Sequence, residues 1–283
     1  MLRIILWGLA LILLTLNILI FSGVMPLDNI QVVEEKTNTK LAEPYNQTPE
    51  ATESKNAQFF VPILMYHYIK DYNNPSDPLG VQLSVSPATL EKQFELIKIL
   101  GYQPITLQDF AAKKYTNNSI ILTFDDGYID HYTNALPLLQ KYNYRASFFI
   151  VSSFVGRSGY MNANQIQELV DAGMEVGGHS ISHKNLASLS FEDAIYDIST
   201  SIRNRELVFA YPSGKYSEQT LDIVSSLGIV ASVTTNLGVA TEKSNLQELP
   251  RIRVKEYTDL TKRINEEIAI AKSTLKPSQR SKD

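Results

Sequence analysis

The chain has 283 residues, a formal net charge of −4 at pH 7 and no cysteine. This length is enough for one barrel-sized domain with accessory segments. The slightly acidic balance leaves no basic footprint for nucleic acid, and the lack of cysteine excludes disulfide bonds and a lipid anchor attached to cysteine.

The N-terminal segment is apolar and carries no charge from Ile4 to Met25. As a helix it would be long enough to cross the roughly 30 Å hydrocarbon core of a bilayer. Residues 1–25 are therefore predicted to be a membrane anchor, with the rest of the chain outside the cytoplasm. The alternative is a signal peptide whose cleavage releases a secreted protein, although no small-x-small cleavage site precedes Pro26.

Residues 26–57 contain few large apolar side chains and many Glu, Lys, Thr, Asn, Pro and Gln residues. A segment of this composition cannot bury a core, so it is predicted to be a disordered tether. The tether would let a catalytic domain over 58–270 reach a polymer at a distance from the membrane. The polar residues 271–283 are predicted to form a flexible tail.

Between these ends, strand and helix patterns alternate along the chain. Ser86 and Pro87 begin one helix, and Asn162 with Gln165 forms the capping box of another. The predicted strands cover 61–66, a segment closed by Ile105, 119–124, 146–151, 207–211 and 229–234. The predicted helices cover 86–100, 106–114, 130–142, 162–173 and 217–227. This alternation favours an α/β fold with a parallel, barrel-like sheet.

Two adjacent carboxylates, Asp125 and Asp126, follow the β-prone run Ser119–Phe124. Gly127 ends that run in a turn, so both carboxylates are expected at a strand tip, where barrel enzymes keep their catalytic groups. Taken alone, an Asp-Asp-Gly sequence is usually a solvated turn.

Two of the four histidines, His179 and His183, follow a second short apolar segment. Their spacing predicts that both imidazoles lie on one face of a helical turn, where with one Asp they would supply three metal ligands. Such a pair alone is more often a polar helix face, but together with the paired carboxylates it predicts a metal-dependent hydrolase. Ser180 stands where a zinc protease carries its Glu, so the base must come from elsewhere.

The blocks Thr123–Gly127 and His179–His183, in this order, resemble those of the polysaccharide deacetylases of the chitin-oligosaccharide deacetylase homology type, the fourth family of carbohydrate esterases. The resemblance covers roughly residues 60–255. It implies a distorted (β/α) barrel, a divalent metal, commonly zinc, and hydrolysis of N-acetyl groups on glycans. By that resemblance Asp125 is the general base, while the metal ligands are Asp126, His179 and His183.

The segment Phe209–Gly214 is similar to a third block of the family, whose backbone helps to form the oxyanion hole. The resemblance offers the backbone N–H of Ser213, in the turn after Pro212, as the oxyanion donor. Many members carry an arginine that orients the base where this chain has Ala210, so another group must set the ionisation of Asp125.

Tyrosines also gather around these motifs. They either line a glycan groove, where sugar rings stack on aromatic faces, or pack within the barrel. The residues concerned are Tyr66, Tyr68, Tyr128, Tyr211 and Tyr216, of which Tyr128 and Tyr211 are the candidate substrate contacts.

The late histidine block of the family is missing, because no histidine follows His183. A subgroup acting on β-1,6-linked N-acetylglucosamine polymers places an early Met-Tyr-His element beside the site, and Met65–His67 resembles that element. His67 is therefore the candidate general acid, because an imidazole with a pKa near neutrality suits protonation of a leaving amine. The alternative is a strand-end histidine bonded to a backbone carbonyl. His131 is expected at the surface.

Three functions remain open from the sequence. The first is a membrane-anchored enzyme that removes N-acetyl groups from an extracellular or cell-wall polysaccharide and releases acetate. The second is an O-acetyl esterase with the same machinery, and the third is a catalytically silent glycan-binding module. The presence of Asp125, Asp126 and both histidines favours an enzyme, because a binding module needs no base beside a metal.

Overall fold

The computed structural model describes residues 58–202 and 207–275. The predicted membrane segment and tether lie outside these residues, as does the end of the predicted tail. Within the described part, no helix is both long enough and apolar enough to cross a bilayer. The last helix, α9 (Leu260–Leu275), continues past residue 270, so the predicted tail begins with helical residues.

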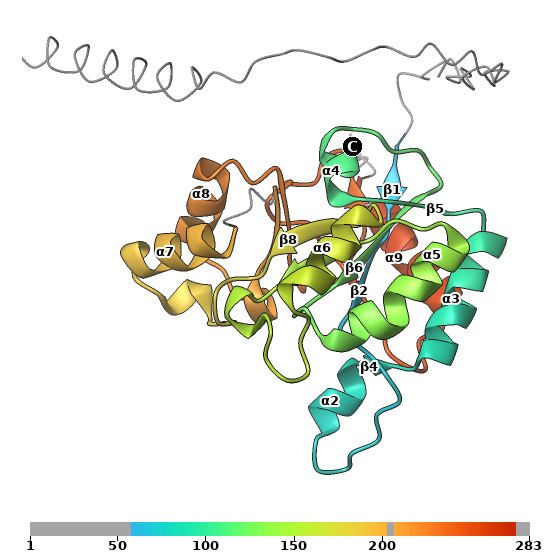
Figure 1. The fold of residues 1–283 in the computed structure, drawn as a ribbon. Coiled ribbons are helices and arrows are strands. Elements are labelled where there is room, and N and C mark those ends of the chain that lie inside the picture. Colours follow the sequence, from blue (N-terminus) through green and yellow to red (C-terminus); the bar gives the residue numbers. More distant parts are fainter. Residues whose placement is uncertain (1–57, 203–206, 276–283) are drawn as a thin grey trace, which may run out of the picture. The chain divides into compact units, whose positions relative to one another are not determined.

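Eight parallel strands form one curled sheet in the order β10-β9-β8-β7-β6-β2-β12, with β5 also paired to β6 (Figure 1). The bounds are β2 Ile63–Tyr66, β5 Gln103–Ile105, β6 Ser119–Phe124, β7 Ser147–Ile150, β8 Glu175–Gly178, β9 Val208–Ala210, β10 Ala231–Val233 and β12 Ile252–Arg253. Leu249 bridges Val233 of β10, and β12 pairs with β2, so residues 249–253 connect the two edges of the sheet. The predicted parallel, barrel-like sheet is confirmed.

Four shorter strands form two small pairs. One pair joins β1 (Phe60–Val61) to β11 (Ala240–Thr241) in antiparallel orientation. The other joins β3 (Tyr68–Ile69) to β4 (Ser84–Val85) in parallel orientation. β3 follows β2 along the chain, so the second pair lies beyond the carboxyl end of β2.

Four of the described helices begin directly after the capping residues that the sequence indicates, Ser86, Thr106, Asn162 and Ser217. The Ser86 side chain accepts a hydrogen bond from the Thr89 N–H, and Asn162 forms its capping box with Gln165. The bounds are α2 Pro78–Leu83, α3 Pro87–Ile99, α4 Leu107–Ala111, α5 Leu136–Tyr142, α6 Ala163–Asp171, α7 Phe191–Ser201 and α8 Glu218–Ser226. A π-helical turn, η1 (His131–Ala135), replaces the first part of the helix predicted over 130–142. The sequence patterns did not predict α2, α7 or α9.

Alternate residues of the central strands belong to different parts of the core. In β6, Leu122 and Phe124 join the apolar cluster that also contains residues of α3, α5 and α6, which lie side by side in Figure 1. Ile121 instead joins the cluster shared by strands on both sides of the curl. Because side chains alternate along a strand, Thr123 and Asp125 follow Ile121 to this inner face. The strand therefore delivers Asp125 to the inner face at the carboxyl end of the sheet.

Candidate active site

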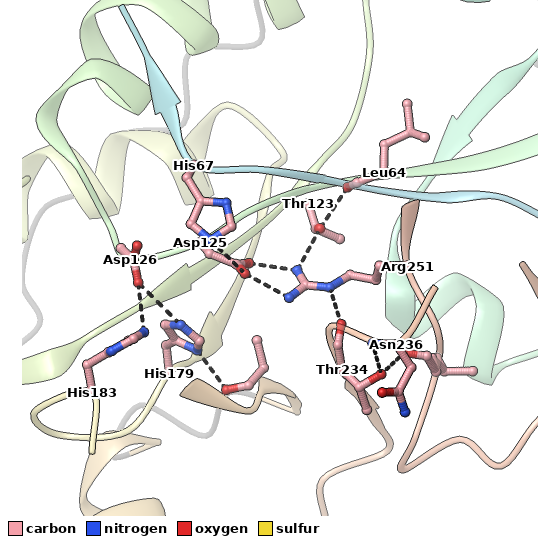
Figure 2. A network of polar contacts seen from close by, with 12 residues as sticks. Leu64, His67, Thr123, Asp125, Asp126, His179, His183, Thr234, Asn236 and Arg251 are labelled. Carbon is pink, nitrogen blue, oxygen red and sulfur yellow. Dashed lines mark hydrogen bonds and ion pairs between the residues drawn. The ribbon is translucent and has the colours of Figure 1, made fainter. Parts of the chain in front are cut away.

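Asp125 and Asp126 turn toward different partners at the end of β6, as Figure 2 shows. The backbone of Asp126 has a φ of 78°, in the left-handed region that few residues other than glycine adopt. Gly127 follows with a φ of 76°. This turn sends the Asp126 carboxylate toward the histidine pair while Asp125 stays on the inner face of the sheet. Two neighbouring carboxylates can therefore have separate roles.

Asp126, His179 and His183 each offer one ligand atom, and these atoms lie within 4.8 Å of one another. Oδ1 of Asp126 is 3.3 Å from Nε2 of each imidazole. The buried His179 ring donates its Nδ1 proton to the Ala210 carbonyl at 2.7 Å, which leaves the Nε2 lone pair available to a metal. One carboxylate with two imidazoles is a donor set that suits zinc and similar divalent ions.

A tight turn, rather than the predicted helical turn, brings the two imidazoles together. Ser180 has a φ of 64° and His183 a φ of 59°, which an α-helix cannot contain. Ser180 Oγ accepts the His183 N–H at 2.9 Å and so closes the turn. The prediction of a helical face was therefore wrong. The two imidazoles nevertheless lie close together, since their ring centroids are 5.0 Å apart.

Asp125 forms a bidentate ion pair with Arg251, a residue that sequence reasoning missed. Nη1 and Nη2 of Arg251 each donate to one carboxylate oxygen at 2.7 Å. The guanidinium is buried and also donates to Thr123 Oγ1 at 3.0 Å and to the Thr234 carbonyl at 2.7 Å (Figure 2). Burial alone would raise the pKa of Asp125, but the charge and hydrogen bonds of Arg251 hold that pKa below its usual range. Arg251 thus supplies the partner that Ala210 cannot.

Only a weak signal in the sequence points to Arg251. It stands 126 residues after Asp125, directly before the apolar Ile252 of a short buried strand. Arg251 and Arg253 alternate with Ile252 and Val254, and a buried arginine needs a partner, since an unpaired buried charge is very costly. Which carboxylate is that partner depends on how the sheet curls, and no local pattern contains that information.

His67 follows β2 and lies beside Asp125, with its Nε2 3.9 Å from Oδ2 of that residue. Its side chain is 14% exposed. Burial is the largest effect on its pKa and, with smaller contributions from Arg251 and Arg253, lowers it to about 4 against the opposing charges of the two aspartates. The imidazole is therefore neutral at pH 7, which differs from the pKa near neutrality expected from the residue type.

His131 is fully buried, so its expected place at the surface was wrong. Its ring packs against the aromatic rings of Phe124, Tyr128 and Phe148. Its Nε2 lies 2.6 Å from the backbone carbonyl oxygen of His67. The expectation failed because η1 packs between β3 and the core instead of starting an exposed helix.

The third block forms a tight turn after β9, and its side chains differ in exposure. Tyr211 is fully buried and its hydroxyl donates to the Gln247 carbonyl at 3.0 Å, so its side chain packs within the barrel, and a contact of this residue with substrate stays a prediction. Pro212 is also buried. Ser213 is exposed and has a φ of 53°, and its role as oxyanion donor stays a prediction.

A row of aromatic rings lies near Asp126. The half-buried Tyr128 ring stacks on Tyr68 and Tyr160 with centroids 4.0 and 5.2 Å away. Phe154 extends the row, 4.8 Å from Tyr160. Burial and then the charge of Asp126 raise the pKa of Tyr128, so its hydroxyl stays protonated. Tyr66, by contrast, is fully buried and belongs to the core.

Residues 112–232 match the family model of the polysaccharide deacetylases. The chain therefore contains a polysaccharide deacetylase domain, and the resemblance seen in its motifs is confirmed.

Individual relatives and solved structures agree with this class. The chain is 29% identical to YxkH of Bacillus subtilis, which bears the name of a polysaccharide deacetylase, over 69% of this chain and 71% of that protein. It is 26% identical to the poly-β-1,6-N-acetyl-D-glucosamine N-deacetylase of Staphylococcus aureus, over 87% of this chain and 92% of that enzyme. The structure of the Streptococcus pyogenes deacetylase PplD, solved with acetate, has a TM-score of 0.68 at 27% identity and covers 74% of this chain and 99% of PplD.

Proposed function

We propose that this protein is a metal-dependent N-deacetylase of polysaccharides that contain N-acetylglucosamine, with β-1,6-linked polymers as the leading substrate. The observation that carries the proposal is the adjacency of an ion-paired carboxylate, Asp125, to the Asp126, His179 and His183 cluster. The similarity to the Staphylococcus aureus enzyme over most of both chains supports the choice of substrate. Hydrolysis then yields acetate and a free amine on the polymer.

The residues present fit a divalent metal such as zinc. The hydrogen bond from His179 to the Ala210 carbonyl fixes the tautomer that leaves Nε2 facing Asp126. Asp126, His179 and His183 would hold the ion, which when bound polarises the amide carbonyl and lowers the pKa of water.

Asp125 acts as the general base. Arg251 keeps its carboxylate ionised and fixes its orientation through two hydrogen bonds. The carboxylate can remove a proton from the attacking water while Asp126 would remain a metal ligand beside His179 and His183. This division explains why two adjacent aspartates are needed.

His67 carries that proton to the leaving nitrogen. It is neutral at rest because its pKa is about 4, so it can accept the water-derived proton through Asp125, 3.9 Å away. The imidazolium then donates the proton to the nitrogen, the C–N bond breaks, and the neutral imidazole is restored. The proton thus moves from water to the amine with no net change on the protein.

Two other features would contact the sugar. The exposed turn at Ser213 offers its backbone N–H to the developing oxyanion. The row that contains Tyr128, Tyr68 and Tyr160 lies near Asp126 and would line the glycan path.

Acetate release by the purified, zinc-loaded protein tests this function. We expect release from N-acetylated β-1,6-linked glucosamine polymer, less from β-1,4-linked chitin oligomers, and none with the Asp125→Asn control. Mass spectrometry of the polymer should show a loss of acetyl mass at amino groups. Release from O-acetylated polymers alone would contradict the proposal and identify an esterase.

A further inference from the structure

Three side chains of the segment that follows the paired aspartates hold the backbone just after β2. His131 Nε2 donates to the His67 carbonyl oxygen at 2.6 Å. Asp130 Oδ1 accepts the Ile69 N–H at 3.0 Å, and Asn134 Nδ2 donates to the Ile69 carbonyl at 2.7 Å. The chain around His67 is therefore fixed by the same segment that leads away from Asp125 and Asp126.

His131 has an unusual set of contacts for a core residue. The side chain is fully buried among aromatic rings, and within the described residues its Nδ1 has no hydrogen-bond partner. The carbonyl of His67 can only accept, so His131 Nε2 carries the proton of this bond, and Asp130 Oδ1 lies 3.9 Å from the same nitrogen. Leaving Nδ1 unpaired costs about 1–3 kcal/mol, which a phenylalanine at this position would avoid. Packing therefore does not explain the histidine, whereas its bond to His67 does.

The backbone form of η1 points the same way. His131 begins a π-helical turn of five residues, a form that is rare and recurs at functional sites. The wider turn places the His131 ring between Phe124 and β3 instead of at the protein surface. This placement directs its Nε2 at the carbonyl group of the residue whose imidazole faces Asp125.

We propose that His131 is a positioning residue for His67. Its hydrogen bond fixes the His67 peptide group, so that the His67 imidazole stays 3.9 Å from Asp125 and can pass a proton to the leaving nitrogen. The inference rests on the proposed N-deacetylase function. It assigns a purpose to a buried histidine that touches neither substrate nor metal ligands.

A positioning role for His131 predicts different effects on two kinds of substrate. Cleavage of an amide requires protonation of the leaving nitrogen, whereas an aryl acetate with a good leaving group does not. Displacement of His67 should therefore slow amide cleavage selectively. A merely structural role for His131 would slow both reactions alike.

The test compares His131→Phe, which keeps a ring but removes the donor, with His131→Gln, whose amide nitrogen can reach the same carbonyl. Tyr66→Phe is the matched control. It removes the buried hydrogen bond from the hydroxyl of Tyr66, the last residue of β2, to Gln93 of α3, and it leaves the hydrogen bond to the His67 carbonyl in place. All variants are loaded with zinc and assayed on the N-acetylated polymer and on 4-nitrophenyl acetate.

We expect His131→Phe to lower kcat on the polymer by about 10- to 100-fold with little change in KM, the range expected for a small displacement of a reacting group. Its aryl acetate hydrolysis and zinc content should match wild type, and His131→Gln should recover most of the polymer activity. Equal losses on both substrates, or full polymer activity in His131→Phe, would overturn the inference. If His131→Phe does not fold, His131→Asn, whose amide is too short, takes its place. Wild-type protein without N-deacetylase activity would instead show that the proposed function has failed.

Discussion

Asp125 and Asp126 are neighbours in the chain, yet the left-handed backbone at Asp126 gives each a different partner. Asp125 has a guanidinium on one side and the His67 imidazole on the other. Asp126 faces two imidazoles. The role of each carboxylate therefore depends on the charge or lone pair that it faces.

Replacing Arg251 should damage stability and activity through the same carboxylate. Arg251→Met leaves Asp125 buried without its counter-ion, and breaking such a pair costs about 3–5 kcal/mol. Adding Asp125→Asn should restore much of the free energy of unfolding, because it removes the unpaired charge, but activity should stay absent. Urea denaturation and acetate release measure the two quantities. Equal instability of the single and double variants would argue against the buried ion pair.

Metal content should distinguish the metal ligands from Asp125, the base. Replacing both His179 and His183 by Ala removes two imidazole donors from the cluster, so bound zinc should fall to near zero with loss of turnover. Asp125→Asn should retain stoichiometric zinc and lose turnover, because Asp125 lies outside the cluster. Elemental analysis after dialysis gives the result. Stoichiometric zinc in the double histidine variant would show that the metal is held elsewhere.

His67→Gln should lose about 10²–10⁴-fold in turnover on the N-acetylated polymer, the usual range for a positioned proton donor. The variant should fold and bind zinc normally, since His67 lies outside the Asp126 cluster. Hydrolysis of an aryl acetate should be far less affected. Kinetics on both substrates decide the matter, and parallel losses would place the proton donor at another residue.

At the scale of elements, the active site is built from strand ends and the turns after them. Asp125 directly follows β6, His179 directly follows β8 and His67 directly follows β2. Asp126, Ser180, His183 and Ser213 are four of the six described residues other than glycine with positive φ. Such conformations cost about 1–3 kcal/mol each and persist only where surrounding structure fixes them. The helices around the sheet supply that support.

Glu256, in the turn between β12 and α9, is bonded to the start of α3 and should make the stability of the protein depend on pH. It accepts hydrogen bonds from Ser86 N–H at 2.6 Å, Ser86 Oγ at 2.9 Å and Thr89 Oγ1 at 2.6 Å, at the start of α3. Burial opposes its charge, but these bonds lower the pKa of Glu256 below its usual value. The stabilisation is therefore complete above the unfolded pKa and is lost as the pH falls through the lower, folded pKa.

Glu256→Gln should accordingly cost about 1 kcal/mol at pH 7, since only the charged acceptor makes all three bonds strong. The difference from wild type should shrink as the pH falls below about 4. Urea denaturation of both proteins at pH 7, 5 and 3.5 measures it. A difference that stays constant with pH would mean that the Glu256 charge contributes nothing.

At the scale of the whole molecule, the curl of the sheet assembles the site from distant parts of the chain. Residues 249–253 reach from β10 to β2, and this path carries Arg251 to Asp125. Residues 58–202 and 207–275 belong to one compact unit, so this part should fold without the residues before it. Catalysis and location should therefore be separable by truncation.

We predict that the full chain sediments with membranes because of the apolar run Ile4–Met25. A chain that begins at Lys55 should be soluble, fold with the same unfolding transition and keep its acetate release. Cell fractionation and accessibility to added protease would show the location of the domain. Recovery of the full-length protein's domain in the medium, beginning after residue 20, would instead indicate a cleaved signal peptide.

Local sequence patterns predicted most of the strands and helices and most of the residues that carry the chemistry. Alternating apolar residues, caps such as Asn162 and the breakers Gly101 and Gly127 act within a few residues, so they predicted most strands and helices and put Asp125 at a strand end. The motifs also identified Asp126, His179 and His183 as candidate metal ligands, and the ligand atoms of these residues lie close together in the structure. These signals are readable because each depends on neighbours along the chain.

Which of these residues contact one another depends on the three-dimensional fold. Arg251 meets Asp125 because the curled sheet joins its edges, and His131 is buried because η1 packs against β3. The turn at Ser180, closed by the hydrogen bond that Ser180 Oγ accepts from the His183 N–H, replaces the predicted helical turn. The pKa of His67 falls to about 4 because neighbours from several strands exclude water around it. Contacts between residues far apart in the chain depend on strand order and burial, which no local pattern encodes.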